Sequence, residues 1–158
     1  MQLNYLFPTR FKKIGWMLFI SGVVLGIFYL VFEMEPRFME LPVFAIAYET
    51  LMGKTKWLTL TENNILDEII TLLILMGGIF AAFSRQKTED EFISKIRLES
   101  LVWATYVNYA VLIFTTLFIY DMTFFWVLVF NMFTVLFFFL ARFNLAMYLI
   151  KKRDSNEE

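Results

Sequence analysis

Cysteine and histidine are both absent from the 158 residues, and each absence removes a group of functions. Without cysteine the chain forms no disulfide and offers neither a thiolate ligand nor a thiol nucleophile. Without histidine it has no imidazole to bind a metal or haem, and no histidine to act as a general base. We therefore expect no catalytic residue, no metal site and no cofactor.

Charged residues are scarce as well. Asp, Glu, Lys and Arg make up 18% of the chain, hydrophobic residues make up 59%, and the mean hydropathy is +0.64. A soluble domain of this size cannot bury so much apolar surface, so the composition indicates a membrane protein. A helix needs about 20 apolar residues to cross the hydrocarbon core of a bilayer. Four runs approach that length: residues 14–32, 65–83, 101–120 and 124–148.

These runs predict an all-α membrane protein with four transmembrane helices in a single domain, residues 1–150, followed by a disordered polar tail, residues 151–158. Lys and Arg beside a span tend to stay in the cytoplasm. They stand before the first span, after the second and after the fourth, whereas the opposite side holds mostly Asp and Glu. We therefore expect a multi-pass protein with both termini in the cytoplasm. Its net charge of −1 balances two faces of opposite sign and gives no reason to expect nucleic acid.

The external loop between the first two spans carries a strand pattern. "PVFAIAY" (42–48) and "WLTLT" (57–61) are rich in β-branched and aromatic residues, and Gly53 lies between them where a turn is needed. The sequence predicts a short external β-hairpin over residues 41–62, which either covers the helix ends or binds something outside. Asp67 and Glu68 follow at the start of the second span, as ordinary helix-start residues or as a cation site.

The most charged internal stretch is "KTEDEFISKIRLES" (87–100). Thr88 and Glu91 have the spacing of a capping box, which predicts a helix from about Glu89 that continues into the third span. The third helix would then extend into the cytoplasm over residues 89–100. This extension either rests on lipid headgroups or docks a cytoplasmic partner. The residues of this candidate interaction surface are Glu89, Asp90, Glu91, Lys95 and Arg97.

Polar residues inside the later spans fall on one face of each helix. At 100° per residue, Asn108 and Thr115 share a face with Arg97 on the third helix, and Asn131 shares one with Arg142 on the fourth. This intramembrane polar seam either fixes the register of the two helices or lines a hydrophilic path.

Arg142 has two predicted partners. An antiparallel pairing of the last two helices brings it near the level of Glu99, although Glu99 lies almost opposite Asn108 on an ideal helix. The alternative partner is a lipid phosphate.

Small residues predict close packing of the first two helices. Gly22 and Gly26 are four apart on the first helix, and Gly77 and Gly78 lie at a similar depth on the second.

The chain resembles a family of small, uncharacterised four-span inner-membrane proteins of Bacteroidota type. The resemblance lies in "VFAIAYETLMG", "NNILDEI", "EDEFISKIRLES" with "YVNY" shortly after, and "VFNMFTVLFFFLARFNL", and it covers most of the chain. It implies membrane topology along the full length and a cytoplasmic helix of mixed charge. It implies no catalytic residues.

Three functions remain to be compared. The first is a non-enzymatic accessory or sensing component that acts through a cytoplasmic or membrane protein partner. The second is a small transporter or channel subunit, which would work as a homo-oligomer. An intramembrane enzyme comes third, because no two carboxylates are placed for acid–base chemistry at one site.

Overall fold

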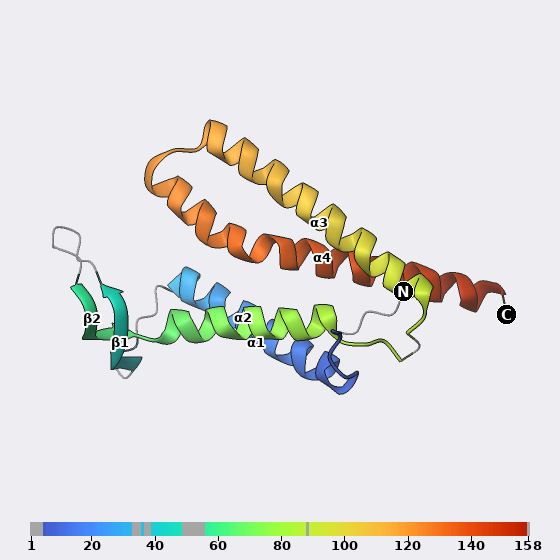
Figure 1. Cartoon of the computed structure of the whole chain (residues 1–158), viewed down its shortest axis with the longest axis horizontal. Helices are drawn as coiled ribbons and strands as arrows, with labels where there is room; N and C mark the ends of the chain where they lie inside the picture. The colour runs from blue at the N-terminus through green and yellow to red at the C-terminus, as the bar shows by residue number, and fades with distance from the viewer. Residues whose placement is uncertain (1–4, 33–35, 37–38, 49–55, 88, 158) are drawn as a thin grey trace.

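The computed structural model describes residues 5–32, 36, 39–48, 56–87 and 89–157, with side chains as far as Arg153. This part of the chain is mostly helical, with four helices and a two-stranded antiparallel sheet (Figure 1). The elements in order are α1 (Arg10–Phe32), β1 (Glu40–Tyr48), β2 (Lys56–Asn64), α2 (Leu66–Phe83), α3 (Glu91–Phe118) and α4 (Asp121–Glu157). The predicted architecture of four long helices, with a β-hairpin between the first two, is confirmed.

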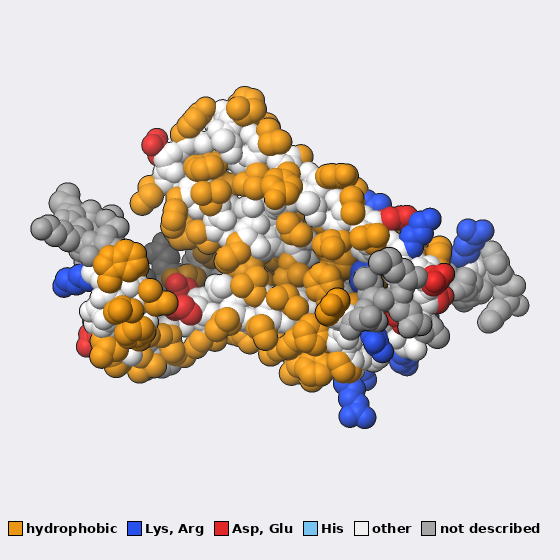
Figure 2. Space-filling view, viewed as in Figure 1, with side chains coloured by type: hydrophobic (Ala, Val, Ile, Leu, Met, Phe, Trp, Pro, Cys, Tyr) orange, Lys and Arg blue, Asp and Glu red, His pale blue; other side chains and the backbone are white. Residues whose placement is uncertain are grey.

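All four helices are long and apolar enough to cross a membrane. Their outward faces carry large hydrophobic side chains, such as Phe28, which is 50% exposed, and Leu117, which is 59% exposed. Figure 2 shows hydrophobic side chains across the middle of the molecule, while Lys and Arg gather at the end where α4 finishes. A wide apolar surface of this kind is suited to lipid.

Helices α1 and α2 form a tightly packed antiparallel pair because glycines remove the side chains between them. A Cβ added to Gly22 would come within 2.9 Å of the backbone nitrogen of Ile74, and one added to Gly77 would lie 2.8 Å from Cα of Phe19. Gly15, which the sequence analysis did not single out, meets the backbone of Ala81 in the same way. Backbones this close leave no room for larger residues, so α1 and α2 behave as one unit.

Helices α3 and α4 form a second antiparallel pair. The turn between them, expected at residues 121–123, lies at Ile119 and Tyr120, and α4 begins at Asp121. Asp121 has a φ of 59°, which a short polar side chain tolerates better than most residues do. The difference is small because a turn at either position leaves α3 and α4 antiparallel.

The start of α3 and the end of α4 also differ from expectation. Helix α3 begins at Glu91 rather than Glu89, and its cap is Asp90, whose carboxylate accepts a hydrogen bond from the backbone of Ile93 at 2.8 Å. The expected cap, Thr88, lies outside the described residues. Helix α4 continues to Glu157, so a disordered tail is the wrong description of residues 151–157. No Gly or Pro follows Asp121, and propagation of an existing helix is easy.

Strands β1 and β2 pair from Glu40 with Asn64 to Tyr48 with Lys56, which extends the first predicted strand at its start and the second at both ends. The turn residues 49–55, including Gly53, lie outside the described part. One face of the sheet carries Phe44 and Leu60, which are paired in register and 63% and 72% exposed. A two-stranded sheet is marginally stable by itself in water, so this apolar face is suited to a membrane surface.

The two helical pairs meet at one end and separate toward the hairpin (Figure 1). Near the middle, Gly78 of α2 receives the side chain of Leu136 from α4. Toward the joined end, the rings of Phe83, Phe139 and Phe143 stack in sequence, with centroids 5.4 and 5.6 Å apart. The packed core therefore lies where α2 ends and α3 begins, and the opposite end is open.

Candidate functional site

A cluster of buried and half-buried polar side chains joins the helices at their packed end. We call it the polar joint, and its residues are Lys12, Ser84, Gln86, Glu89 and Arg97. Lys12 comes from α1, Ser84 ends α2, Gln86 and Glu89 lie in the connection, and Arg97 comes from α3.

Arg97 is the centre of the joint, with 2% of its surface exposed. Its Nη2 lies 3.2 Å from Oε2 of Glu89 and donates to the carbonyl oxygen of Ser84 at 3.4 Å. Its Cζ lies 5.2 Å from the ring centroid of Phe143 on α4. A single guanidinium thus contacts the end of α2, the connection and α4, and its charge is compensated by Glu89 and by the aromatic face.

Glu89 extends the joint to α1. Its Oε2 also accepts a hydrogen bond from the backbone of Gln86 at 2.8 Å, and the side-chain oxygen of Gln86 accepts one from Nζ of Lys12 at 2.6 Å. Beside them, Phe7 donates to the carbonyl of Phe83 and accepts from the backbone of Arg85, both at 2.9 Å. The start of the described chain is therefore tied to the end of α2.

Four buried atoms of the joint have no hydrogen-bond partner within the described residues: Nε2 of Gln86, Oε1 of Glu89, and Nε and Nη1 of Arg97. Buried polar atoms of this kind are usually satisfied by internal water, because leaving them unpaired is unfavourable. Three of the four are donors, so the joint favours partners that accept hydrogen bonds.

The residues of the predicted interaction surface lie in different environments in the structure. Glu91 and Lys95 are exposed, and Asp90 caps α3. Arg97, by contrast, is buried, so its assignment to an exposed interaction surface was wrong, whereas Glu89 is half-buried and pairs with it. The signal was in the sequence, because Arg97 lies on the same helical face as Asn108.

The intramembrane seam residues lie between α3 and α4. Nδ2 of Asn131 donates to Oδ1 of Asn108 at 2.9 Å, which joins the two predicted polar faces. Thr115 is buried and donates to the carbonyl of Leu112 in its own helix at 3.0 Å. Arg142 does not pair with Glu99; its Cζ lies 4.9 Å from the ring centroid of Trp103.

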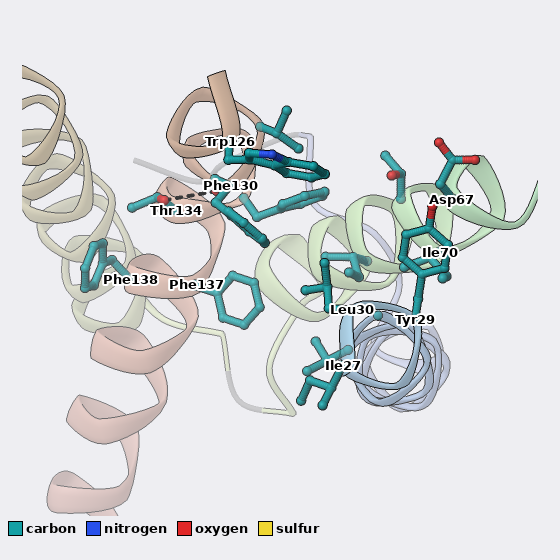
Figure 3. Close-up of a pocket in the computed structure, with 16 residues that line it drawn as sticks. Ile27, Tyr29, Leu30, Asp67, Ile70, Trp126, Phe130, Thr134, Phe137 and Phe138 are labelled. Atoms are coloured by element: carbon teal, nitrogen blue, oxygen red, sulfur yellow. Dashed lines mark hydrogen bonds between the residues drawn. The ribbon is translucent and has the colours of Figure 1, made fainter. Parts of the chain in front are cut away.

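At the open end, a pocket of about 500 Å³ lies between the α1–α2 pair and α4 (Figure 3). One wall is an aromatic stripe on α4, made of Trp126, Phe130, Phe133 and Phe137. These residues are spaced at intervals of four, three and four, so they share one face of the helix. Sequence reasoning missed the pocket, although this stripe was a signal for it.

Across from the stripe, α2 presents Ile70, Ile74 and Asp67 to the pocket. Asp67 is the one charged residue in the lining. Its neighbour Glu68 accepts a hydrogen bond from Nδ2 of Asn63 at 2.6 Å, and Oδ1 of Asn64 accepts one from the backbone of Leu66 at 3.1 Å. The two Asn side chains therefore support the start of α2, and Asp67 borders the pocket.

No group of three or more His, Cys, Asp or Glu residues in the described ranges could hold a metal ion. No family model, curated protein or solved structure matches the chain. The resemblance to small four-span proteins therefore stays a prediction, and the argument for function depends on the pocket and the polar joint.

Proposed function

We propose that the chain is a non-enzymatic, multi-pass protein of the bacterial inner membrane that works as an accessory or sensing component. Its two helical pairs are joined at one end by the polar joint and separated at the other by the pocket. A molecule in the pocket would change the angle between the pairs. Helices α3 and α4, which extend beyond the apolar zone at the joined end, would carry that change to a protein partner.

The single observation that carries this proposal is the position of the pocket between the two pairs. The α1–α2 contact is fixed by glycine packing, so it is the less flexible of the contacts. Motion would therefore be concentrated between the pairs, where Leu136 of α4 packs on Gly78 of α2 and the ring of Phe137 lies 5.0 Å from that of Phe19 on α1. The exposed side chains of Glu91 and Lys95 would move with α3 and would form a surface that a protein partner could bind.

The orientation rests on charge. Lys13 precedes the apolar part of α1 and Lys152 follows that of α4, whereas Glu62 belongs to the hairpin. By the positive-inside rule the joined end faces the cytoplasm and the hairpin faces outward. The hairpin would then lie with Phe44 and Leu60 on the outer lipid surface.

Because the chain has no cysteine, single introduced cysteines report topology directly. We expect a membrane-impermeant maleimide to label Glu62→Cys on spheroplasts, and to label Lys13→Cys and Lys152→Cys only after permeabilisation. All three side chains are exposed, so burial does not explain a difference. Labelling of either lysine position from outside would overturn the orientation.

Spin labels test the proposed motion. Leu72→Cys and Phe125→Cys place labels on exposed positions of α2 and α4, and Ile20→Cys with Leu72→Cys places them within the α1–α2 pair. Val129 lines the pocket, so Val129→Trp fills part of it. We expect this change to shift the 72–125 distance and to leave the 20–72 distance unchanged. An unchanged 72–125 distance would contradict the mechanism.

The pocket also favours a second candidate, a small transporter or channel subunit that works as a homo-oligomer. Its apolar walls and single carboxylate would suit a lipophilic solute in transit. Reconstituted vesicles separate the two candidates. Saturable, proton-coupled uptake would support the transporter, whereas binding without uptake by a monomer would support the sensing component.

A further inference from the structure

The pocket has the size and lining of a small-molecule site. Its volume of about 500 Å³ lies within the ~300–1,000 Å³ typical of ligand pockets. Figure 3 shows the aromatic side chains of α4 facing the residues of α1 and α2 across the cavity. Trp126 and Phe130 stand near its α4 side, and Tyr29 extends from α1 toward Asp67 on α2.

The charge of the lining indicates the sign of the charge that a ligand would carry. Asp67 is the one ionisable acid in the lining, which contains no Lys or Arg, and Glu68 lies exposed in the same helical turn. No described Lys or Arg forms an ion pair with Asp67. A phosphate or carboxylate headgroup would meet the carboxylate of Asp67 and, among the described residues that line the pocket, no Lys or Arg.

The aromatic stripe points to the same ligand. Faces of Trp, Tyr and Phe attract cations, most strongly where water is excluded. They also supply apolar contact for the body of a ligand. A carboxylate on one side of the pocket with aromatic side chains on the other therefore matches a molecule that is both apolar and positively charged.

We propose that the pocket binds a lipophilic monocation, with its charged centre at Asp67 and its apolar part against Trp126 and Phe130. This inference rests on the proposed function in one respect, that the pocket is the working site. It adds the chemical class of the ligand. A zwitterionic aminophospholipid is disfavoured, because its phosphate would lie near Asp67 and Glu68.

Tetraphenylphosphonium is a suitable probe, and tetraphenylborate is its matched control with nearly the same shape and the opposite charge. Binding is measured at equilibrium with the full-length protein in phosphatidylcholine nanodiscs. We expect saturable binding of the cation and only unsaturable partition of the anion. Equal saturable binding of both ions would overturn the proposal, because the site would then recognise only apolar shape.

Two pairs of variants locate the site. We expect Asp67→Asn, which removes the one carboxylate of the lining, to weaken cation binding by about tenfold. The neighbouring Glu68→Gln should change it by less than about threefold, because Glu68 is exposed like Asp67 but does not line the pocket. Val129→Trp should abolish binding, while Leu128→Trp, on the adjacent exposed position, should retain it. Equal losses for Asp67→Asn and Glu68→Gln would overturn the assignment to Asp67.

Nanodiscs that contain phosphatidylethanolamine test the other source of an ammonium group. Unchanged affinity for the phosphonium supports a free lipophilic cation, whereas competitive loss would assign the pocket to an aminophospholipid and overturn the proposal. Cysteine labelling of the same samples keeps the two proposals distinct. Correct topology without cation binding overturns only the ligand, whereas external labelling of Lys13→Cys overturns the proposed function.

Discussion

Asn131 on α4 donates a hydrogen bond to Asn108 on α3, with 2.9 Å between the side-chain nitrogen and oxygen. Asn108 is buried and Asn131 is half-buried, within helices that are otherwise apolar at this depth. Each amide satisfies the other among apolar side chains, so we expect the pair to fix how the two helices align. A displacement of one residue along either helix would separate the two amides.

The first prediction concerns this pair. We expect Asn108→Leu or Asn131→Leu to lower the free energy of unfolding by about 1 kcal/mol, since each change leaves one buried amide without its partner. The coupling in the double variant should be near ~0.6 kcal/mol, the average for hydrogen bonds between membrane helices. Unfolding in mixed micelles, followed by circular dichroism, measures both. Additive effects of the two changes would mean that the bond contributes nothing.

The second prediction concerns the polar joint. Arg97→Met leaves the half-buried Glu89 without its cation, and Glu89→Met leaves the buried guanidinium without its anion. Removing one partner of a buried ion pair typically costs about 3–5 kcal/mol, so Glu89→Met, which leaves the buried charge unpaired, should be the more destabilised of the two. The double variant should recover part of that loss, because no unpaired charge remains. Thermal unfolding in detergent measures the three, and a double variant as unstable as the sum of the singles would contradict the pairing.

The third prediction compares two glycines of one helix. An added Cβ at Gly22 would lie 2.9 Å from the backbone nitrogen of Ile74, whereas one at Gly26 would lie 3.3 Å from the Cγ2 atom of Ile70. A backbone cannot move aside as a side chain can. We expect Gly22→Ala to destabilise by about 1–3 kcal/mol through overpacking. Gly26→Ala should be neutral or slightly stabilising, because alanine is the better helix former.

Unfolding in mixed micelles distinguishes these two variants, which share the same chemical change and the same helix. Equal effects at Gly22 and Gly26 would show that the α1–α2 contact is looser than the structure has it. The comparison also tests rigidity of the pair, on which the proposed motion between α2 and α4 depends.

The helices and the seam could be predicted from sequence because both depend on local pattern. A run of about 20 apolar residues is a sufficient signal for a span, and the 3.6-residue period places Asn108 on the face that meets α4. The hairpin followed from β-branched and aromatic residues around a turn. These features require no knowledge of how distant segments pack.

The polar joint and the pocket depend on that packing. Glu89 joins Arg97 only because the connection after α2 turns back, which starts α3 at Glu91 rather than earlier. The pocket exists because the pairs diverge beyond Gly78 and Leu136, and periodicity carries no information on that angle. The spacing of the aromatic stripe could be recognised in the sequence, but the helices that it faces could not.

The last prediction decides between partners of Arg142. The sequence offered Glu99 or a lipid phosphate, whereas the structure places the guanidinium over Trp103, with 4.9 Å between Cζ and the ring centroid. Cation–π contacts contribute about 0.5–2 kcal/mol, with the larger values where water is excluded. Trp103→Leu should therefore lower the free energy of unfolding by about 1 kcal/mol more in the presence of Arg142 than in an Arg142→Gln background. Glu99→Gln should show no such dependence, because Glu99 makes no contact with Arg142. Coupling at Glu99 and none at Trp103, measured by unfolding in mixed micelles, would instead support the Arg142–Glu99 ion pair that the antiparallel pairing of the last two helices predicted. Independence from both would leave the lipid phosphate as the partner, and the stability of the protein should then depend on the headgroup of the lipid used.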